Sequence, residues 1–223
     1  MTTDTEAAKL ARLIVENQPR IVLTARIPRR RAGWPQKPQP IYRETGLVTD
    51  DPIAVVPYDP EWPRRFEAER ALLEGLLAPW LAGGIHHIGS TAIPGIAAKP
   101  IIDMMAGVRD LQESRAAFVP LGKECYVYAP HRPSIAHHFV KPSVRVSEMT
   151  HGLHLTEPGS DLWRERLAFR DALRRDRRLI TEYETLKLRL AQEHRVDDEA
   201  YTAGKRAFVA RVLGSAGLQL GRR

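Results

Sequence analysis

A glycine-serine turn followed by a lone acid is the part of this sequence best suited to chemistry. Residues 86–105 read HHIGSTAIPGIAAKPIIDMM, with Gly89 and Ser90 after a short apolar segment and Asp103 within the next one. The backbone N–H groups of Gly89, Ser90 and Thr91 carry no bulky side chains and can bind phosphate oxygens. Turn and acid together predict a nucleotide-phosphate and metal site. The alternative is a tight connector whose aspartate caps neighbouring amides.

The strand predicted over residues 99–108 places this acid among apolar residues. Because alternate residues of a strand face opposite sides, Asp103 shares a face with Ile101 and Met105. Burying an ionised carboxylate costs free energy unless a cation, a hydrogen-bond donor or a metal ion lies next to it. Asp103 therefore predicts such a partner on its side of the strand.

Lysines interrupt the apolar stripes of the predicted C-terminal helices. Lys187 falls on the stripe that contains Tyr183, and Lys205 falls on the stripe that contains Tyr201. A lysine in such a position either extends to water or binds an anion. Two of them, in a chain of net charge +7, favour an anionic ligand between the helices and the sheet.

Two further cations are candidates for the same anion. Arg170 borders an apolar helix face, and its guanidinium either binds phosphate through two hydrogen bonds or pairs with an acid such as Asp171. Lys99 directly precedes the strand of Asp103 and is close enough in sequence to reach the same ligand.

The order of predicted elements indicates a single α/β or α+β domain, with a mixed sheet flanked by helices. Predicted strands cover residues 53–56, 85–88, 99–108, 126–128, the surroundings of 139, and 144–155. Predicted helices cover residues 6–17, 60–76, 110–119, 160–175, 178–193 and 198–213. Residues 28–40 are rich in proline and arginine and predict an extended arm, either a solvated loop or a contact to phosphate or a partner. The chain thus divides into an extension (1–50), a main domain (51–216) and a tail (217–223).

The composition is that of a globular protein in a reducing compartment. Of the 223 residues, 43% are hydrophobic and 27% charged, and the single cysteine, Cys125, excludes an internal disulfide. No apolar run approaches the roughly 20 residues needed to cross a bilayer, and the N-terminal residues lack the pattern of a signal peptide. We therefore expect a cytoplasmic protein without membrane contact.

The net charge of +7 favours anionic partners. A phosphate-bearing small molecule and a nucleic acid both satisfy that charge. Aromatic residues are few and are not interleaved with arginines as in single-strand binding surfaces, so nucleic acid is the less favoured partner.

Five segments in collinear order resemble the GrpB family, spanning roughly residues 53–214. They are VVPYDPEWPRRFEAE, HIGSTAIPGIAAKPIIDMM, FRDALRR, YETLKLRLA and YTAGKRAFVARVL. The resemblance implies a nucleotidyltransferase fold of the polymerase-β type with a C-terminal helical segment. In that fold a Gly-Ser turn, here Gly89 and Ser90, binds the triphosphate, and Asp103 matches the first member of a metal-binding Asp-x-Asp pair.

Met105 stands where the second acid of that pair belongs. A thioether does not replace a hard oxygen ligand of Mg²⁺. Three alternatives follow: one metal ion suffices, another acid substitutes, or the chain binds a nucleotide without ordinary transfer chemistry. On the predicted strand over 144–155, Glu148 is the candidate substitute, and His154 falls where related enzymes have a third carboxylate.

The resemblance implies a Mg²⁺-dependent nucleotidyltransferase, or a related phosphoryl- or adenylyl-transfer enzyme, that uses a nucleoside triphosphate and a small acceptor. A nucleotide- or anion-binding module without catalysis, and an ATP-dependent ligase working through an adenylate, are the alternatives. The expected catalytic residues are Asp103, His154 and Lys187. The expected phosphate-binding residues are Gly89, Ser90, Thr91, Lys99, Arg170 and Lys205. The expected metal ligands are Asp103 and Glu148.

Overall fold

Five strands form one mixed sheet in the computed structural model, which describes residues 51–218. The strand order is β1-β2-β5-β4-β3; β2 and β5 run parallel and the other neighbours antiparallel. The strands are β1 (Leu81–Ile88), β2 (Ile102–Val108), β3 (Val127–Tyr128), β4 (His137–Lys141) and β5 (His151–Thr156). The predicted helix over residues 6–17 and the predicted arm over residues 28–40 lie outside the described residues.

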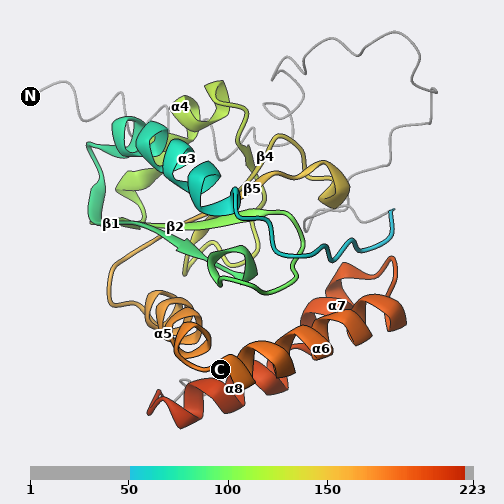
Figure 1. The fold of residues 1–223 in the computed structure, drawn as a ribbon. Helices are drawn as coiled ribbons and strands as arrows, with labels where there is room; N and C mark the ends of the chain where they lie inside the picture. The colour runs from blue at the N-terminus through green and yellow to red at the C-terminus, as the bar shows by residue number, and fades with distance from the viewer. Residues whose placement is uncertain (1–50, 219–223) are drawn as a thin grey trace, which may run out of the picture.

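Helices lie on both sides of this sheet, with α3 and α4 on one side and α5 to α8 on the other (Figure 1). The helices are α3 (Trp62–Leu77), α4 (Phe118–Lys123), α5 (Asp161–Arg175), α6 (Arg177–Glu193), α7 (Asp198–Gly204) and α8 (Arg206–Ser215). This arrangement confirms the predicted mixed sheet with a C-terminal helical segment. Within residues 51–218, no helix has both the length and the apolar character required to span a bilayer.

The side of the sheet that faces α3 carries the main hydrophobic core. Leu73 and Leu77 of α3 are fully buried and pack in one cluster with Met104 of β2 and Leu153 of β5. Because side chains alternate along β2, Asp103 points to the other side, toward the C-terminal helices.

On that other side, the loop between β1 and β2 packs against the C-terminal helices. Ile93 and Ile96 are fully buried in a cluster with Leu173 of α5 and Phe208 of α8. This apolar contact fixes the helices over the end of the sheet where Asp103 lies.

Short polar residues begin the C-terminal helices near the predicted starts. Ser160, Asp176 and Asp197 each accept a hydrogen bond from a backbone N–H in the first turn, at 3.3, 2.8 and 2.9 Å respectively. The prediction of one helix over residues 198–213 is wrong in one respect, because α7 ends at Gly204 and α8 starts after Lys205. Gly204 packs so closely on α6 that a Cβ atom there would clash with the side chain of Leu190 on that helix.

Two predicted strands differ from the observed structure. Residues 144–155 do not form one strand: η3 (Val146–Glu148) is a 3-10 turn, and β5 begins only at His151. The turn is closed by a 3.0 Å hydrogen bond from Glu148 N to the carbonyl of Arg145. Residues 53–56 form a single bridge, in which Val56 pairs with Ala98.

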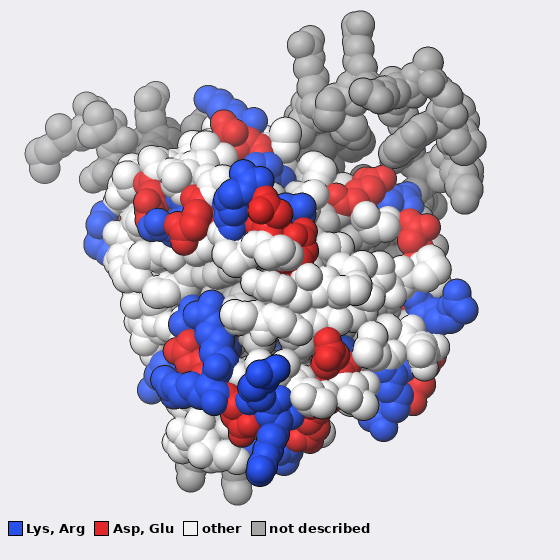
Figure 2. All heavy atoms as spheres, viewed as in Figure 1, with Lys and Arg blue, Asp and Glu red and all other residues white. Residues whose placement is uncertain are grey.

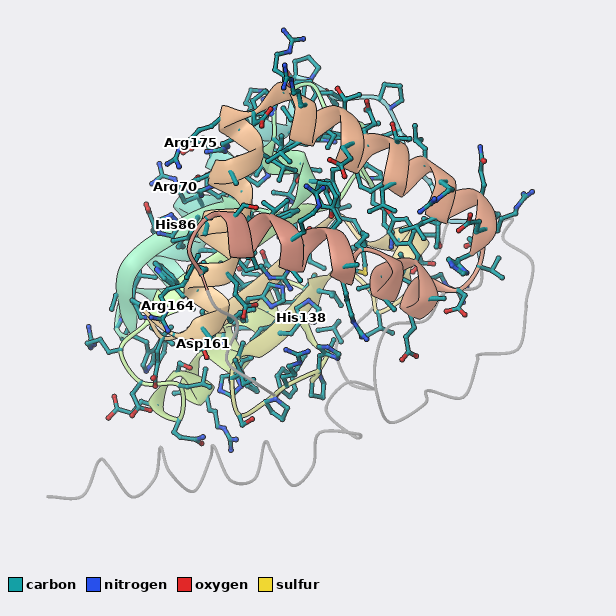
Figure 3. The ribbon with its side chains drawn as sticks, turned by 90° about the horizontal axis from the view of Figure 1, so that it is seen from below. Arg70, His86, His138, Asp161, Arg164 and Arg175 are labelled. Carbon is teal, nitrogen blue, oxygen red and sulfur yellow. The ribbon has the colours of Figure 1, made fainter. Side chains whose placement is uncertain are left out.

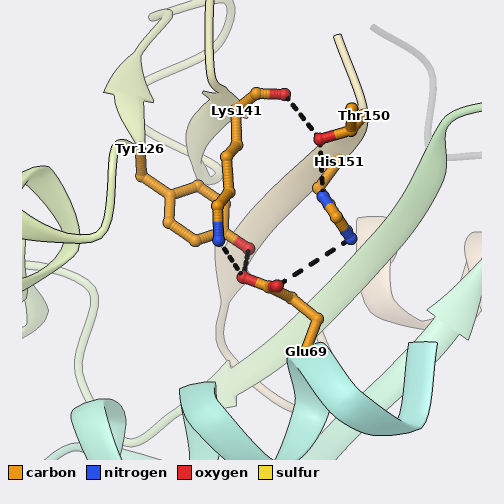
Figure 4. Close-up of polar contacts among 5 residues, drawn as sticks. All are labelled: Glu69, Tyr126, Lys141, Thr150 and His151. Carbon is orange, nitrogen blue, oxygen red and sulfur yellow. Dashed lines mark hydrogen bonds and ion pairs between the residues drawn. The ribbon is translucent and has the colours of Figure 1, made fainter. Parts of the chain in front are cut away.

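A partly buried polar network connects α3 to the edge of the sheet (Figure 4). Glu69 of α3 accepts hydrogen bonds from Tyr126 at 3.0 Å and from Lys141 at 2.7 Å. His151 lies 3.9 Å from the same carboxylate and is bound by Thr150 at 2.8 Å. Each polar group of this network is paired with another member, so we assign the network a structural role. It lies on the side of the sheet opposite Asp103.

Two adjacent leucines of α3 test this description of the core. Leu73→Ala removes a fully buried side chain, and we expect it to lower the free energy of unfolding by about 2–5 kcal/mol. Leu72→Ala, at a position that is 37% exposed, should cost less than about 1 kcal/mol. Equilibrium unfolding in urea measures both values. Equal losses would contradict the assigned orientation of α3.

Candidate anion-binding site

The carboxylate of Asp103 occupies space left by two glycines. Asp103 lies on β2 between Ile88 of β1 and Gly152 of β5. A Cβ atom at Gly89, the residue after Ile88, would lie 2.4 Å from Asp103 Oδ2, and one at Gly152 would lie 2.8 Å from Oδ1. Gly89 also has φ +68°, a conformation that other residues rarely adopt. The carboxylate could not lie there if either glycine carried a side chain.

Three cations from different parts of the chain act electrostatically on this carboxylate. Arg166 of α5, Lys205 between α7 and α8, and Lys99 before β2 all interact favourably with its negative charge, whereas Asp198 of α7 opposes it. We call these five residues the Asp103 cluster. The cluster exists only because the C-terminal helices pack over the sheet.

Burial changes the acidity of Asp103. Loss of hydration raises the pKa of its carboxyl to about 6, although Arg166, Lys205 and Lys99 act in the opposite direction. Asp103 therefore titrates close to neutral pH, where it can accept or release a proton.

The aromatic ring of Tyr201 holds two of the cations. The ammonium groups of Lys205 and Lys99 lie 4.1 and 4.8 Å from its centroid. Lys99 also forms an ion pair with Asp198. Burial lowers the pKa of Lys205 to about 8, and the charge of Lys99 acts in the same direction. The protonated form of Lys205 is therefore disfavoured, and an added negative charge would stabilise it.

Ser90 meets the C-terminal helices through Tyr183 of α6. Burial raises the pKa of Tyr183 to about 12, while a hydrogen bond with Ser90 and the charge of Arg166 oppose that rise. The Tyr183 ring stacks on Phe208 of α8 at 5.0 Å. Asp103 also contributes to the electrostatics of Tyr183, so Ser90 and Asp103 lie in one neighbourhood.

Thr91 does not contribute to the site in the way that its place in the turn predicts. Its hydroxyl donates to the carbonyl of Ile101 at 2.9 Å and accepts from His87 Nε2 at 3.0 Å. The His87 ring stacks on Phe66 of α3 at 4.7 Å, and burial lowers the pKa of His87 to about 4. Thr91 and His87 thus form a buried structural pair.

Lys187 and Arg170 also bind groups of the protein itself. Lys187 is only 1% exposed, and its Nζ donates to the carbonyl of Ala97. Arg170 donates to Asp171 at 2.7 Å and to the carbonyl of His87 at 3.1 Å. Both side chains use their charged groups to bind segments next to the Asp103 cluster. Neither charged group is therefore directed at the proposed ligand.

His154 lies on β5 beside the cluster, stacked on His138 of β4. The two ring centroids are 4.4 Å apart and the planes differ by 14°. Burial lowers the pKa of His154 well below its usual range, and the charges of His138 and Arg166 add to that effect. Figure 3, seen from the side of the C-terminal helices, shows His138 on the sheet next to α5. Both rings are therefore neutral at physiological pH.

A family comparison agrees with this architecture. Residues 52–215 match the family model described as GrpB protein. The chain belongs to the GrpB family.

Several relatives illustrate the extent of this similarity. The glutamate-rich protein GrpB of Alkalihalophilus pseudofirmus is 35% identical over 169 residues, covering 74% of this chain and 97% of that protein. The UPF0157 protein PA4798 of Pseudomonas aeruginosa is 38% identical over 188 residues, covering 82% and 75%. The crystal structure of the conserved protein GrpB from Enterococcus faecalis superposes with a TM-score of 0.66 at 30% identity, covering 73% of this chain and 96% of that one.

A relative with a stated activity matches only in part. The dephospho-CoA kinase of Mycolicibacterium paratuberculosis is 32% identical over 127 residues, which cover 55% of this GrpB chain and 29% of the kinase.

The metal site implied by the nucleotidyltransferase resemblance does not fit the residues of this GrpB chain. Glu148, the expected substitute ligand, lies on η3 and not on β5, is 43% exposed in its side chain and lies 3.5 Å from Arg145. In residues 51–218 no three His, Cys, Asp or Glu side chains converge to hold a metal ion. The remaining acid near Asp103 is Asp198, which Lys99 already neutralises. Three cations around one carboxylate are the wrong donor set for paired Mg²⁺ ions.

Sequence reasoning missed Arg166, although it interacts with more of the site than any predicted cation. Its charge acts on Asp103, Lys205, Tyr183 and His154. Arg166 stands four residues before Arg170, so helical spacing was a usable signal for the same face of α5.

A surface groove of about 640 Å³ lies elsewhere, between α6 and α8. It is lined by Glu182, Thr185, Leu186, Arg189, Gly204, Ala207, Phe208 and Arg211. No member of the Asp103 cluster lines this groove, so it is a separate feature.

The raised pKa of Asp103 predicts that the free energy of unfolding depends on pH. Between the unfolded value of 3.8 and the folded value of about 6, the folded carboxyl holds a proton that the unfolded one has lost. Stability from this group is therefore present below pH 3.8 and lost as the pH rises through 6. Relative to Asp103→Asn, the wild type should lose about 1–2 kcal/mol between pH 4 and pH 7.5, after allowing for partial exposure.

Urea denaturation of both proteins across this pH range provides the measurement. A difference between wild type and Asp103→Asn that stays constant with pH would show that Asp103 titrates normally in the folded chain.

Proposed function

We propose that this GrpB chain binds a phosphorylated small molecule at the Asp103 cluster, with Arg166, Lys205 and Lys99 in contact with phosphate oxygens. The observation that carries the proposal is that three cations from separate segments, two of them over the ring of Tyr201, act on one carboxylate that lies between two glycines. Within the described residues, neither Arg166 nor Lys205 forms a hydrogen bond or ion pair with a carboxylate at 4.0 Å or less. An anionic ligand supplies the missing partners.

Asp103 restricts the class of ligand. A bare phosphate would face the repulsion of this carboxylate whenever it is ionised. A ligand that carries a hydroxyl near its phosphates can donate a hydrogen bond to Asp103 while its phosphates bind the cations. Nucleotides combine both features through their ribose hydroxyls, so we assign a nucleotide as the ligand.

Group transfer is the second candidate, favoured by the pKa of Asp103 near 6. A carboxylate of that basicity suits a general base at neutral pH. An acceptor hydroxyl would attack a phosphorus atom of the nucleotide and pass its proton to Asp103, and pyrophosphate or a nucleoside diphosphate would leave. Arg166 and Lys205 would stabilise the charge that develops on the phosphate oxygens. Any Mg²⁺ would then arrive with the nucleotide.

The similarity to part of a dephospho-CoA kinase supports the ligand class only. That protein is named for a substrate that contains adenosine and pyrophosphate, and its similarity to this chain covers 29% of its length. Dephospho-CoA therefore joins ATP and GTP as a probe.

The surface gives less support to a nucleic-acid partner. On the face drawn in Figure 2, lysine and arginine side chains alternate with aspartate and glutamate. Among the described residues, charged side chains also form local pairs, such as Arg64 with Glu61 and Arg164 with Asp161. A duplex needs an extended basic surface, which the described residues of this face do not offer.

Ligand binding and two cation variants test the proposal. We expect at least one of ATP, GTP and dephospho-CoA to raise the melting temperature, since a ligand at 100 times its Kd adds about 2.7 kcal/mol to stability. Arg166→Gln and Lys205→Gln should each weaken binding by about 10- to 100-fold in calorimetry, because each removes a charge-assisted hydrogen bond.

Arg164→Gln is the matched control, because Arg164 lies on the same helix, is exposed and pairs with Asp161 at 2.6 Å (Figure 3). It should bind as the wild type does. Titrations with and without Mg²⁺, and product analysis by chromatography, separate binding from transfer. The proposal fails if no probe binds, or if Arg164→Gln weakens binding as much as Arg166→Gln.

A further inference from the structure

Both backbone polar groups of Ala97 are bound by side chains of α6. Ala97 N donates to Glu184 Oε1 at 2.6 Å, and Lys187 Nζ donates to the carbonyl of Ala97. Because Glu184 and Lys187 are three residues apart, they lie on the same side of α6. Hydrogen bonds with an ionisable partner are stronger than those between neutral groups, so Ala97 is held firmly on this helix.

Ala97 lies in the segment that carries two groups of the candidate site. Residues 90–99 leave β1 with Ser90 and reach β2 through Lys99. Ile93 and Ile96 are fully buried against the C-terminal helices and hold the first part of this segment. Directly after Ala97, the chain reaches Lys99, which forms an ion pair with Asp198 and acts electrostatically on Asp103.

The environment of Lys187 indicates that its amine serves this contact. The side chain is 1% exposed and its Nζ lies 5.0 Å from the ring of Tyr183. Burying an amine costs free energy, which a methionine of similar length would avoid. What the amine adds over such a side chain is the hydrogen bond to Ala97.

We propose that Glu184 and Lys187 are positioning residues, which fix the conformation of residues 90–99 and so hold Lys99 and Ser90 beside Asp103. The effect on ligand affinity rests on the proposed function above. The effect on the conformation of the segment does not, and it is measurable without a ligand.

The test compares Glu184→Ala with Glu184→Gln. Both variants remove the same negative charge, but glutamine keeps a side-chain oxygen that can accept from Ala97 N. Lys187→Met removes the second hydrogen bond. Glu182→Ala is the control, because Glu182 is an exposed residue of α6 that pairs with Arg211.

Two ligand-free measurements are made on each variant by NMR: the hydrogen-exchange rate of the Ala97 amide and the titration of the Asp103 carboxyl. In Glu184→Ala the Ala97 amide should exchange at least about tenfold faster, as expected for a lost hydrogen bond to a charged group. The midpoint of Asp103 should also rise, because Lys99 moves away. Glu184→Gln and Glu182→Ala should stay close to wild type, and Lys187→Met should resemble Glu184→Ala in both measurements.

Equal exchange rates in Glu184→Ala and Glu184→Gln would overturn the inference, because the hydrogen bond would then not hold the segment. Faster exchange with an unchanged Asp103 titration would also overturn it, because Lys99 would then be placed by other contacts. If ATP binds the wild type, Glu184→Ala should weaken it about tenfold. If none of ATP, GTP and dephospho-CoA binds the wild type, the proposed function fails, and the two ligand-free measurements still decide the inference.

Discussion

The candidate site depends on a partly buried carboxylate that lies between two glycines. Asp103 stands at the start of β2, where the absence of side chains at Gly89 and Gly152 leaves room for its two oxygens. Ionising a carboxyl in that position costs free energy. The cost is offset in part by Arg166, Lys205 and Lys99, and the remainder appears as a pKa raised to about 6.

The electrostatics of Asp103 are linked to the packing of the C-terminal helices. An apolar contact through Ile93 and Ile96 brings them over the sheet, and the same helices carry Arg166 and Lys205, whose charges act on Asp103. Tyr201 adds a ring surface for two ammonium groups, which partly offsets their mutual repulsion. Packing and electrostatics thus act on one interface, because the helices that bury the apolar loop also carry the cations.

The distribution of charge also separates this chain from a two-metal enzyme. Carboxylates that gather around metal ions repel one another until the metals bind, whereas here cations outnumber the acids around Asp103. Met105 is fully buried next to His154, so the position of the missing second acid is filled by an apolar side chain.

Part of this picture could be predicted from local patterns. The mixed sheet, most of the helices and the GrpB family follow from hydrophobic spacing, capping residues and the motif around Gly89. The lysines on apolar stripes predicted an anionic ligand between the helices and the sheet, whereas the effect of Lys205 on Asp103 follows from the tertiary structure. Glu148 was misplaced because a 3-10 turn interrupts the predicted strand, and strand periodicity does not reveal such a turn.

The sequence by itself determined most of the elements and placed lysines on the apolar stripes of the C-terminal helices, because these features depend on the order of neighbouring residues. Only the tertiary structure decided how each charge is used. Lys187 and Arg170 bind backbone carbonyls, while Arg166 and Lys205 form no ion pair with a described carboxylate and act on Asp103 through their charge. The physical reason is that the role of a charged side chain is set by its nearest partner, and that partner comes from a segment far away in the chain.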